Sequence, residues 1–199
     1  LAVAQWNQLR DTLIPLGCEV EIMIPQPGWP DMVFTANAGL AKGSQFIRAN
    51  FRHAERAGEA CWFEEWFAGK GFDLWRLPEN VAYEGEGDSL FCAGRLFCGH
   101  AFRTDEEAHH LISQALECEV VPLKLTDPNF YHLDTCFCAL GDDTVAWFPE
   151  AFDATSRDVV RERIVDRIEV SAEEAHRFAC NAIVLDQDII LPEGCPIFA

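Results

Sequence analysis

The chain has 199 residues, of which 49% are hydrophobic and 12% aromatic, which is enough to bury the core of one domain. Its formal charge of −18, from 33 acidic and 15 basic residues spread along the chain, argues against binding of nucleic acid or anionic lipid and favours small cations. No stretch reaches 18 apolar residues and no secretory signal is visible, so neither a membrane span nor export is predicted.

The first part of the chain is predicted to form a helix, a strand, a hairpin and a second helix and strand. Apolar residues recur at helical spacing over 3–17, and the segment 18–25 is predicted as a strand. A hairpin follows at 37–47, where two apolar runs flank a turn. The next helix is predicted at 52–71, where an amphipathic pattern stops at a glycine, and it leads into a strand at 72–78.

The rest of the chain repeats this order of elements. A helix at 104–117 opens with Thr104 as its predicted N-cap and with an acidic first turn. The other elements are expected as hairpins at 88–99, 134–148 and 181–192, strands at 118–125 and 167–171, and helices at 153–166 and 172–179.

Each hairpin begins with a polar residue, and these residues recur at a nearly constant interval. Asn37, Asp88, Asp134 and Asn181 follow one another at intervals of 46 to 51 residues. A unit of helix, strand, polar residue and hairpin cannot bury its apolar faces alone, so the units must stand side by side with helices outside and strands inside. A radial arrangement would bring the polar residues to a common centre; the alternative is that they are only turn signals.

Three carboxylates crowd the segment before the second hairpin. Glu84, Glu86 and Asp88 alternate with Gly85 and Gly87. An extended backbone would place the carboxylates on one side, and the glycines would let a ligand approach the main chain closely. Because like charges at this density repel unless a cation lies among them, we predict a cation-binding site. A solvated acidic turn is the alternative.

The segment 129–140, NFYHLDTCFCAL, combines a histidine, an aspartate and two cysteines. In a strand that starts at the tyrosine, alternation would place on one face His132, Asp134, Cys136 and Cys138. Cysteines deeper in a hairpin behave as small hydrophobic residues. A zinc site is disfavoured because a second ligand pair at the usual spacing is missing, so neither a metal nor a cofactor is predicted.

Five motifs in this order resemble those of one enzyme superfamily: DMVFTANAGL, YEGEGD, GHAFRTD, FYHLDTCFC and FACNAIVL. The chain is similar to the amidinotransferases and guanidine hydrolases, most of all to the dimethylarginine-hydrolase-like branch and the arginine dihydrolases. The resemblance implies an α/β propeller, or pentein, of five helix-and-sheet units around a pseudo-fivefold axis, with the active site at the centre. Four hairpins are predicted in this chain, so we expect the propeller to be incomplete.

The resemblance also implies roles for the polar residues. His132 and Asp134 match the His-x-Asp motif, with His132 as general acid and base and Asp134 as its companion. Glu84 resembles the catalytic carboxylate, and Asp88 resembles a group that binds the substrate guanidinium. The family often has Glu-x-Gly-Asp, whereas this chain has Glu-Gly-Glu-Gly-Asp, so Glu86 competes for these roles.

Two further residues are expected to contact the substrate. Asn37 offers a carbonyl acceptor and an amide donor and resembles a further guanidinium contact, although Asn is also common in turns. Arg103 resembles the arginine that binds the α-carboxylate of an amino-acid substrate; an ordinary surface arginine is the alternative. The predicted partner is a small guanidino cation such as arginine or methylarginine. The one macromolecular partner left open is a second copy of this chain, in a homo-oligomer.

The chemistry implied by the resemblance is hydrolysis through a covalent thiouronium intermediate. A cysteine thiolate attacks the guanidinium carbon, and His132 protonates the departing amine and then activates water. The same site would serve an amidinotransferase if an amine replaced water. A non-catalytic protein that binds guanidino compounds is the third reading.

The nucleophilic cysteine is expected beyond residue 199, because Cys180 and Cys195 stand at unsuitable places in the repeat. We therefore expect residues 1–199 to be a single domain that is truncated at both ends and inactive alone. The nine cysteines are odd in number and widely spaced, which predicts reduced thiols in a cytoplasmic protein.

Overall fold

The computed structural model describes residues 1–195 and has a mixed α/β architecture. It begins with helix α1 (Ala2–Leu13) and the 3₁₀ helix η1 (Ile14–Leu16). The strand predicted at 18–25 is wrong, because this segment has no regular secondary structure. A strand needs a neighbour that pairs with its backbone, and none of the strands in the described residues pairs with 18–25.

Three sheets of the same topology follow along the chain. They consist of β1 (Gly39–Lys42), β2 (Gln45–Arg48) and β3 (Asp73–Trp75); β4 (Ser89–Cys92), β5 (Arg95–His100) and β6 (Val120–Lys124); and β7 (Phe137–Ala139), β8 (Thr144–Trp147) and β9 (Asp166–Glu169). In each sheet the first two strands form an antiparallel hairpin and the third pairs parallel with the second. A final hairpin contains β10 (Ile183–Leu185) and β11 (Asp188–Ile190).

Helices connect each hairpin to the third strand of its sheet, as parallel pairing requires. They are α2 (Ala54–Ala57) and α3 (Ala60–Gly69) in the first sheet, α4 (Glu106–Leu116) in the second and α5 (Ala154–Arg163) in the third; α6 (Ala172–Ala175) precedes the last hairpin. The structural unit is therefore hairpin, helix, strand. The sequence predicted that each helix and strand belong with the hairpin that follows them. This prediction is wrong, because the strand after each helix pairs with the hairpin that precedes the helix. None of the helices in residues 1–195 is long and apolar enough to cross a membrane.

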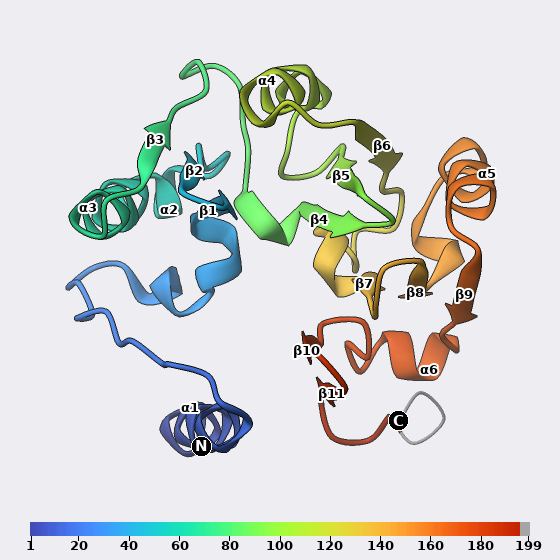
Figure 1. Ribbon diagram of the computed structural model, residues 1–199, viewed down its shortest axis with the longest axis horizontal. Helices are drawn as coiled ribbons and strands as arrows, with labels where there is room; N and C mark the ends of the chain where they lie inside the picture. The colour runs from blue at the N-terminus through green and yellow to red at the C-terminus, as the bar shows by residue number, and fades with distance from the viewer. Residues whose placement is uncertain (196–199) are drawn as a thin grey trace.

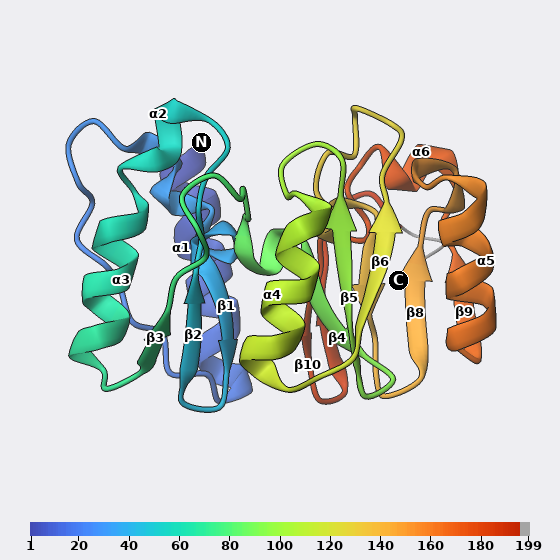
Figure 2. The ribbon, with the colours of Figure 1, turned by 90° about the horizontal axis from the view of Figure 1, so that it is seen from above.

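The sheets follow one another in an arc, with α3, α4 and α5 on the outer side (Figure 1). Seen from above, α4 and α5 run alongside the strands (Figure 2). The sheets of residues 1–195 do not close into a barrel. The hairpins lie on the inner side of the arc, so the segments that lead into them approach one another.

Apolar side chains join neighbouring sheets. Leu40 of β1 and Leu96 of β5 are buried in one cluster with Ile112 of α4. Phe97 of β5 and Phe137 of β7 belong to a second cluster, with their ring centroids 5.4 Å apart. Burial of such side chains contributes roughly 1.5–3 kcal/mol each, which fixes the relative positions of the sheets and of the turns they carry.

A 3₁₀ turn precedes each of the first three hairpins: η3 (Thr35–Ala38), η4 (Gly85–Gly87) and η5 (Leu133–Thr135). Besides η1, the remaining 3₁₀ helices of the described residues are η2 (Pro30–Val33) and η6 (Pro149–Ala151). The strand predicted to start at Tyr131 therefore begins only at Phe137. The backbone N–H of Cys136 donates to Leu133 O at 3.0 Å, which closes the turn. His132 and Asp134 consequently lie on a turn, and strand alternation does not determine where they point.

Candidate active site

Equivalent positions of the four units meet at one cavity. Three residues before the first strand of each hairpin stand Ala36, Glu86, Asp134 and Cys180, and all four line a cavity of about 880 Å³. The polar residues predicted to be equivalent stand one to three residues before their strands, so their register differs from the one the sequence suggested. Of the four polar residues predicted to share a centre, Asn37, Asp134 and Asn181 line this cavity, and Asp88 is buried behind it.

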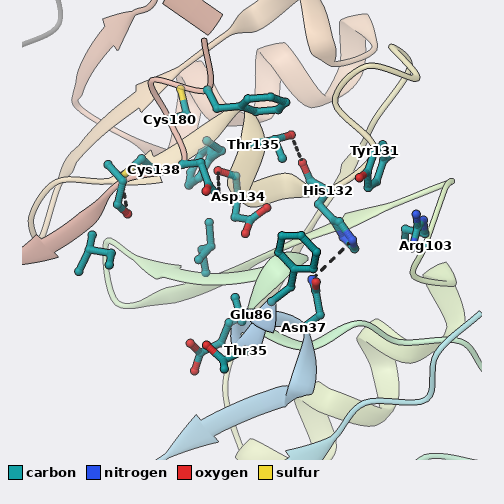
Figure 3. Close-up of a pocket in the computed structure, with 18 of the residues that line it drawn as sticks. Thr35, Asn37, Glu86, Arg103, Tyr131, His132, Asp134, Thr135, Cys138 and Cys180 are labelled. Carbon is teal, nitrogen blue, oxygen red and sulfur yellow. Dashed lines mark hydrogen bonds between the residues drawn. The ribbon is translucent and has the colours of Figure 1, made fainter. Parts of the chain in front are cut away.

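The seven predicted site residues divide into two groups. Those that line the cavity are Asn37, Glu86, Arg103, His132 and Asp134. Glu84 and Asp88 lie behind them, fully buried. Figure 3 shows the imidazole of His132 pointing toward Asn37, with Asp134 on the same turn.

His132 lies between two buried carboxylates. Its Nε2 is 3.3 Å from Glu84 Oε2, and its Nδ1 is 3.3 Å from Asp88 Oδ2. Burial alone would lower the pKa of His132, but the two carboxylates outweigh it and raise the pKa to about 9. The imidazole is therefore held as an imidazolium near neutral pH and can donate a proton.

Asp88 is occupied on both oxygens. Oδ1 accepts from the backbone N–H of Leu133 at 3.1 Å, and Oδ2 accepts from the hydroxyl of Thr104 at 2.7 Å. Thr104 was predicted to cap α4, but the cap position is Asp105. Thr104 is a site residue that sequence reasoning missed; its place directly after Arg103 was the available signal. Asp88 thus anchors the turn that carries His132.

Glu84 remains an anion despite its burial. It accepts from Arg103 Nη1 at 3.2 Å and from the backbone N–H of Arg52 at 3.4 Å. Burial raises the pKa of Glu84, but the contacts with His132, Arg103 and the Arg52 N–H together lower it. The guanidinium of Arg103 also stacks over the ring of Tyr131, 4.6 Å from its centroid. Arg103 therefore faces the cavity and is not an isolated surface residue.

Glu86 and Asp134 are carboxylates that face the cavity without a basic partner. Among residues 1–195 neither forms an ion pair with lysine or arginine. Burial raises the pKa of Glu86. Burial also raises the pKa of Asp134, to about 7, with the charge of Asp88 adding to the effect and His132 opposing it. A cation bound in the cavity beside either carboxylate would offset the cost of burying that group. No group of three or more His, Cys, Asp or Glu residues within the described chain has metal-binding geometry.

Asn37 is fixed by an arginine that the sequence analysis did not single out. Its Oδ1 accepts from Arg56 Nη1 at 2.8 Å, and its Nδ2 lies 3.5 Å from His132 Nε2. Asn37 was expected to offer a carbonyl acceptor to a guanidinium, but that oxygen is already used. The one local signal for Arg56 was an acidic residue, Glu59, three positions on at helical spacing.

The cysteines that line the cavity are poor nucleophiles. Burial raises the pKa of Cys138 to about 11, and burial raises the pKa of Cys180 still further. The pKa of Cys195 is raised as well. Because the thiolate is the reactive form, these side chains remain neutral thiols near pH 7. The raised pKa values of Cys180 and Cys195 support the expectation that neither is the nucleophile.

Gly87 provides the space in which Asn37 and His132 meet. A Cβ atom at this position would collide with Asn37 Nδ2 and lie 3.3 Å from His132 Nδ1. We expect Gly87→Ala to lower the free energy of unfolding by about 1–3 kcal/mol, as overpacking does, and to shift the imidazole NMR signals of His132. Gly141→Ala is the matched control, since no atom lies within 4 Å of its Cβ. Equal stability of the two variants would contradict the prediction.

The raised pKa of His132 links its ion pairs to stability. The folded-state pKa of about 9 exceeds the unfolded value of 6.5, so the stabilisation is complete below pH 6.5 and is lost as the pH rises through 9. Its full size is on the order of 3 kcal/mol. We compare the free energy of unfolding of the unsubstituted protein with that of His132→Gln. The difference should decrease as the pH rises from 6.5 to 9. Urea unfolding at several pH values measures this difference in free energy. If the difference does not change with pH, His132 does not form the ion pairs with Glu84 and Asp88.

Comparison with known proteins gives consistent matches. Residues 1–190 match the family model described as N,N-dimethylarginine dimethylhydrolase, eukaryotic. The chain is 44% identical over 194 residues to the bifunctional arginine dihydrolase/ornithine cyclodeaminase ArgZ of Synechocystis sp., covering 96% of this chain and 27% of that protein. It is 37% identical over 199 residues to the dimethylarginine dimethylaminohydrolase of Mycobacterium tuberculosis, covering all of this chain and 65% of that protein.

Solved structures agree with these matches. The crystal structure of the N-terminal domain of ArgZ bound to its substrate superposes with a TM-score of 0.92 at 43% identity, covering 94% of this chain and 70% of that one. A dimethylarginine dimethylaminohydrolase, at 21% identity and a TM-score of 0.85, shares the fold. This chain spans about a quarter of ArgZ and about two thirds of the mycobacterial enzyme.

Proposed function

This chain belongs to the N,N-dimethylarginine dimethylhydrolase family, and from that premise we propose that it hydrolyses the guanidino group of arginine or of a methylated arginine. One observation carries the proposal: two carboxylates without a basic partner, Glu86 and Asp134, face the same cavity as the imidazolium of His132. A guanidinium is a permanent planar cation with several donors, and fixed carboxylates bind it better than they bind a compact ammonium group. The names of the relatives, an arginine dihydrolase and a dimethylarginine hydrolase, support this ligand class.

We assign the binding roles from these positions. Glu86 and Asp134 hold the guanidinium, since both line the cavity and neither is paired with a lysine or arginine in the described residues. Arg103 binds the substrate α-carboxylate, because its guanidinium faces the cavity above Tyr131. We do not assign Asn37 to the guanidinium, because its Oδ1 is bonded to Arg56 and its NH₂ group finds no acceptor on a guanidinium.

The catalytic roles follow from the contacts of His132. Glu84 is the catalytic carboxylate, because it contacts Nε2, the ring atom nearest Asn37 and the cavity. Asp88 orients the imidazole through Nδ1 and does not touch the substrate, since Thr104 and the backbone of Leu133 occupy its oxygens. The roles of Asp88 and Asp134 are thus exchanged relative to those implied by the family pattern.

The reaction then proceeds in two steps. A thiolate forms a bond to the guanidinium carbon, the bond from that carbon to the leaving nitrogen breaks, and His132 gives its Nε2 proton to the departing amine. The neutral His132 next takes a proton from water, and the resulting hydroxide attacks the same carbon. The bond from that carbon to sulfur breaks, the thiolate leaves, and the O-protonated urea product loses its proton to solvent. Cys138 and Cys180 are unsuited to supply that thiolate. A nucleophile beyond residue 199 stays a prediction.

We also propose the finer structural and cellular features. Three sheets of like topology and a further hairpin that meet at one cavity support a propeller of the kind the resemblance implies. All nine cysteines are free, which supports a reducing, cytoplasmic setting. A homo-oligomer stays a prediction.

Binding and turnover should be measured separately on this chain. Calorimetry with arginine and with dimethylarginine tests the cavity, and assays for citrulline, ornithine, ammonia and dimethylamine test hydrolysis. A relative, AgrE, has been crystallised as a cysteine-to-alanine variant with L-arginine, so in that protein binding does not need the substituted cysteine. We expect this chain to bind a guanidino amino acid. If neither compound binds, the proposed function is wrong. Because the nucleophile is predicted beyond residue 199, binding without product is the expected result for residues 1–199. The same result with protein that extends past residue 199 and includes that cysteine would favour the non-catalytic alternative.

A further inference from the structure

A buried ion pair holds the amide of Asn37 from behind. Asn37 Oδ1 accepts from Arg56 Nη1 at 2.8 Å. The Nε and Nη2 atoms of Arg56 donate to the carboxylate of Glu59 at 3.1 and 2.9 Å, and Nη2 also donates to Asp31 O at 3.1 Å. The guanidinium lies 4.5 Å from the ring centroid of Phe51. Glu59 is fully buried and Arg56 is 6% exposed, so this arginine has little freedom to move.

This arrangement leaves the amide of Asn37 one orientation. Because its oxygen is bonded to Arg56, its NH₂ group must face His132 Nε2, 3.5 Å away (Figure 3). An NH₂ group donates hydrogen bonds and cannot accept them. It can therefore bond to the lone pair of a neutral imidazole, but it cannot accept the Nε2 proton of an imidazolium.

The other charged groups around His132 act mainly in the opposite direction. Glu84 and Asp88 contact its two ring nitrogens, and the charge of Asp134 adds to theirs, so all three favour the imidazolium. Arg103 neutralises part of the charge of Glu84. An imidazolium suits protonation of the leaving amine, whereas activation of water needs the neutral ring. Asn37 is the hydrogen-bonding group that favours the neutral ring.

We propose that Arg56 is a positioning residue: it holds the Asn37 amide with its NH₂ group toward His132 Nε2, which stabilises the neutral imidazole that acts as the general base. The assignment of His132 as acid and base rests on the proposed function, but the hydrogen-bond geometry does not. Without Arg56 the amide can rotate, and its oxygen can then accept the Nε2 proton. The imidazolium would gain a hydrogen bond and the base form would lose one.

The test is the double variant Arg56→Met/Glu59→Met, because removal of Arg56 alone would leave the Glu59 carboxylate buried without a partner. The double variant keeps the net charge unchanged. We expect NMR titration of the His132 imidazole to show a pKa about one unit higher than in the unsubstituted protein, as the exchange of one hydrogen bond for another predicts. No shift would overturn the proposal.

The same double substitution in an Asn37→Ala background tests whether the Arg56–Glu59 pair acts on the pKa of His132 through the Asn37 amide. We expect no further shift of the His132 pKa there, since the amide that Arg56 orients is gone. A shift of equal size in both backgrounds would show that the pair acts on His132 without Asn37 and would overturn the proposal. Arg56→Lys, which keeps a donor for Asn37 Oδ1, should retain most of the original pKa.

Kinetics give a second reading where the protein turns over. The alkaline limb of the pH profile of kcat/KM reports loss of the imidazolium that protonates the leaving amine. This limb should move to higher pH by the same amount as the NMR pKa, with KM for arginine nearly unchanged. The NMR result stands without turnover, so a failure of the proposed function and a failure of the role of Arg56 are distinguishable.

Discussion

Replacement of His132 by glutamine is expected to lower the rate of guanidine hydrolysis by about 10³-fold, the size typical for loss of a positioned acid and base. The imidazole lies 3.3 Å from Glu84 and 3.3 Å from Asp88 and lines the cavity, so it is the group placed to move protons there. Glutamine keeps a polar side chain of similar reach but cannot exchange a proton. The dissociation constant for arginine should change by less than about tenfold, because the proposed guanidinium ligands remain.

Single-turnover product assays beside calorimetry on the same samples separate these effects, with protein extended past residue 199 to include the predicted nucleophile. Unchanged product formation by the glutamine variant would remove His132 from the chemistry. A fall in affinity as large as the fall in rate would assign it to binding. His110, outside the site, is the matched control: His110→Gln should leave both quantities unchanged.

The elements of the fold were largely predictable because their signals are local. Alternating apolar residues and glycine turns predicted the four hairpins, and amphipathic periodicity predicted α3, α4 and α5. The segment 18–25 shows the limit of this reasoning: its apolar alternation suits a strand, but a strand depends on a partner elsewhere. The grouping of each helix with the preceding hairpin likewise depends on parallel pairing, which sequence spacing does not reveal.

The candidate site was predictable as a set of residues but not as a geometry. All seven predicted side chains lie at the cavity or directly behind it. The 3₁₀ turns before the strands shift the register, so that Glu86 and Asp134 are equivalent whereas Asp88 lies deeper. Thr104 and Arg56 act through side chains that are distant in sequence, Asp88 and Asn37, and no local pattern marks such contacts.

Asp134→Asn should cause the largest loss of ligand affinity. Asp134 faces the cavity as a carboxylate without a basic partner, and a bound guanidinium would be its counterion. Removal of one member of a buried charged pair costs about 3–5 kcal/mol, which corresponds to arginine binding weakened by about 100-fold or more. Asparagine has nearly the same shape, so the loss reports charge. Asp188→Asn, at an exposed hairpin turn, is the matched control and should bind as the unsubstituted protein does.

The pH dependence of binding tests the same carboxylate in a second way. The pKa of Asp134 is raised to about 7, so in the free protein the carboxylate gains its charge as the pH rises through that value. Arginine keeps its charge throughout, so its affinity should increase between pH 6 and 8 and level off above. Calorimetry over this range should show the increase for the unsubstituted protein and for Asp188→Asn but not for Asp134→Asn. If the asparagine variant keeps the same pH dependence, another group titrates and Asp134 is not the guanidinium ligand.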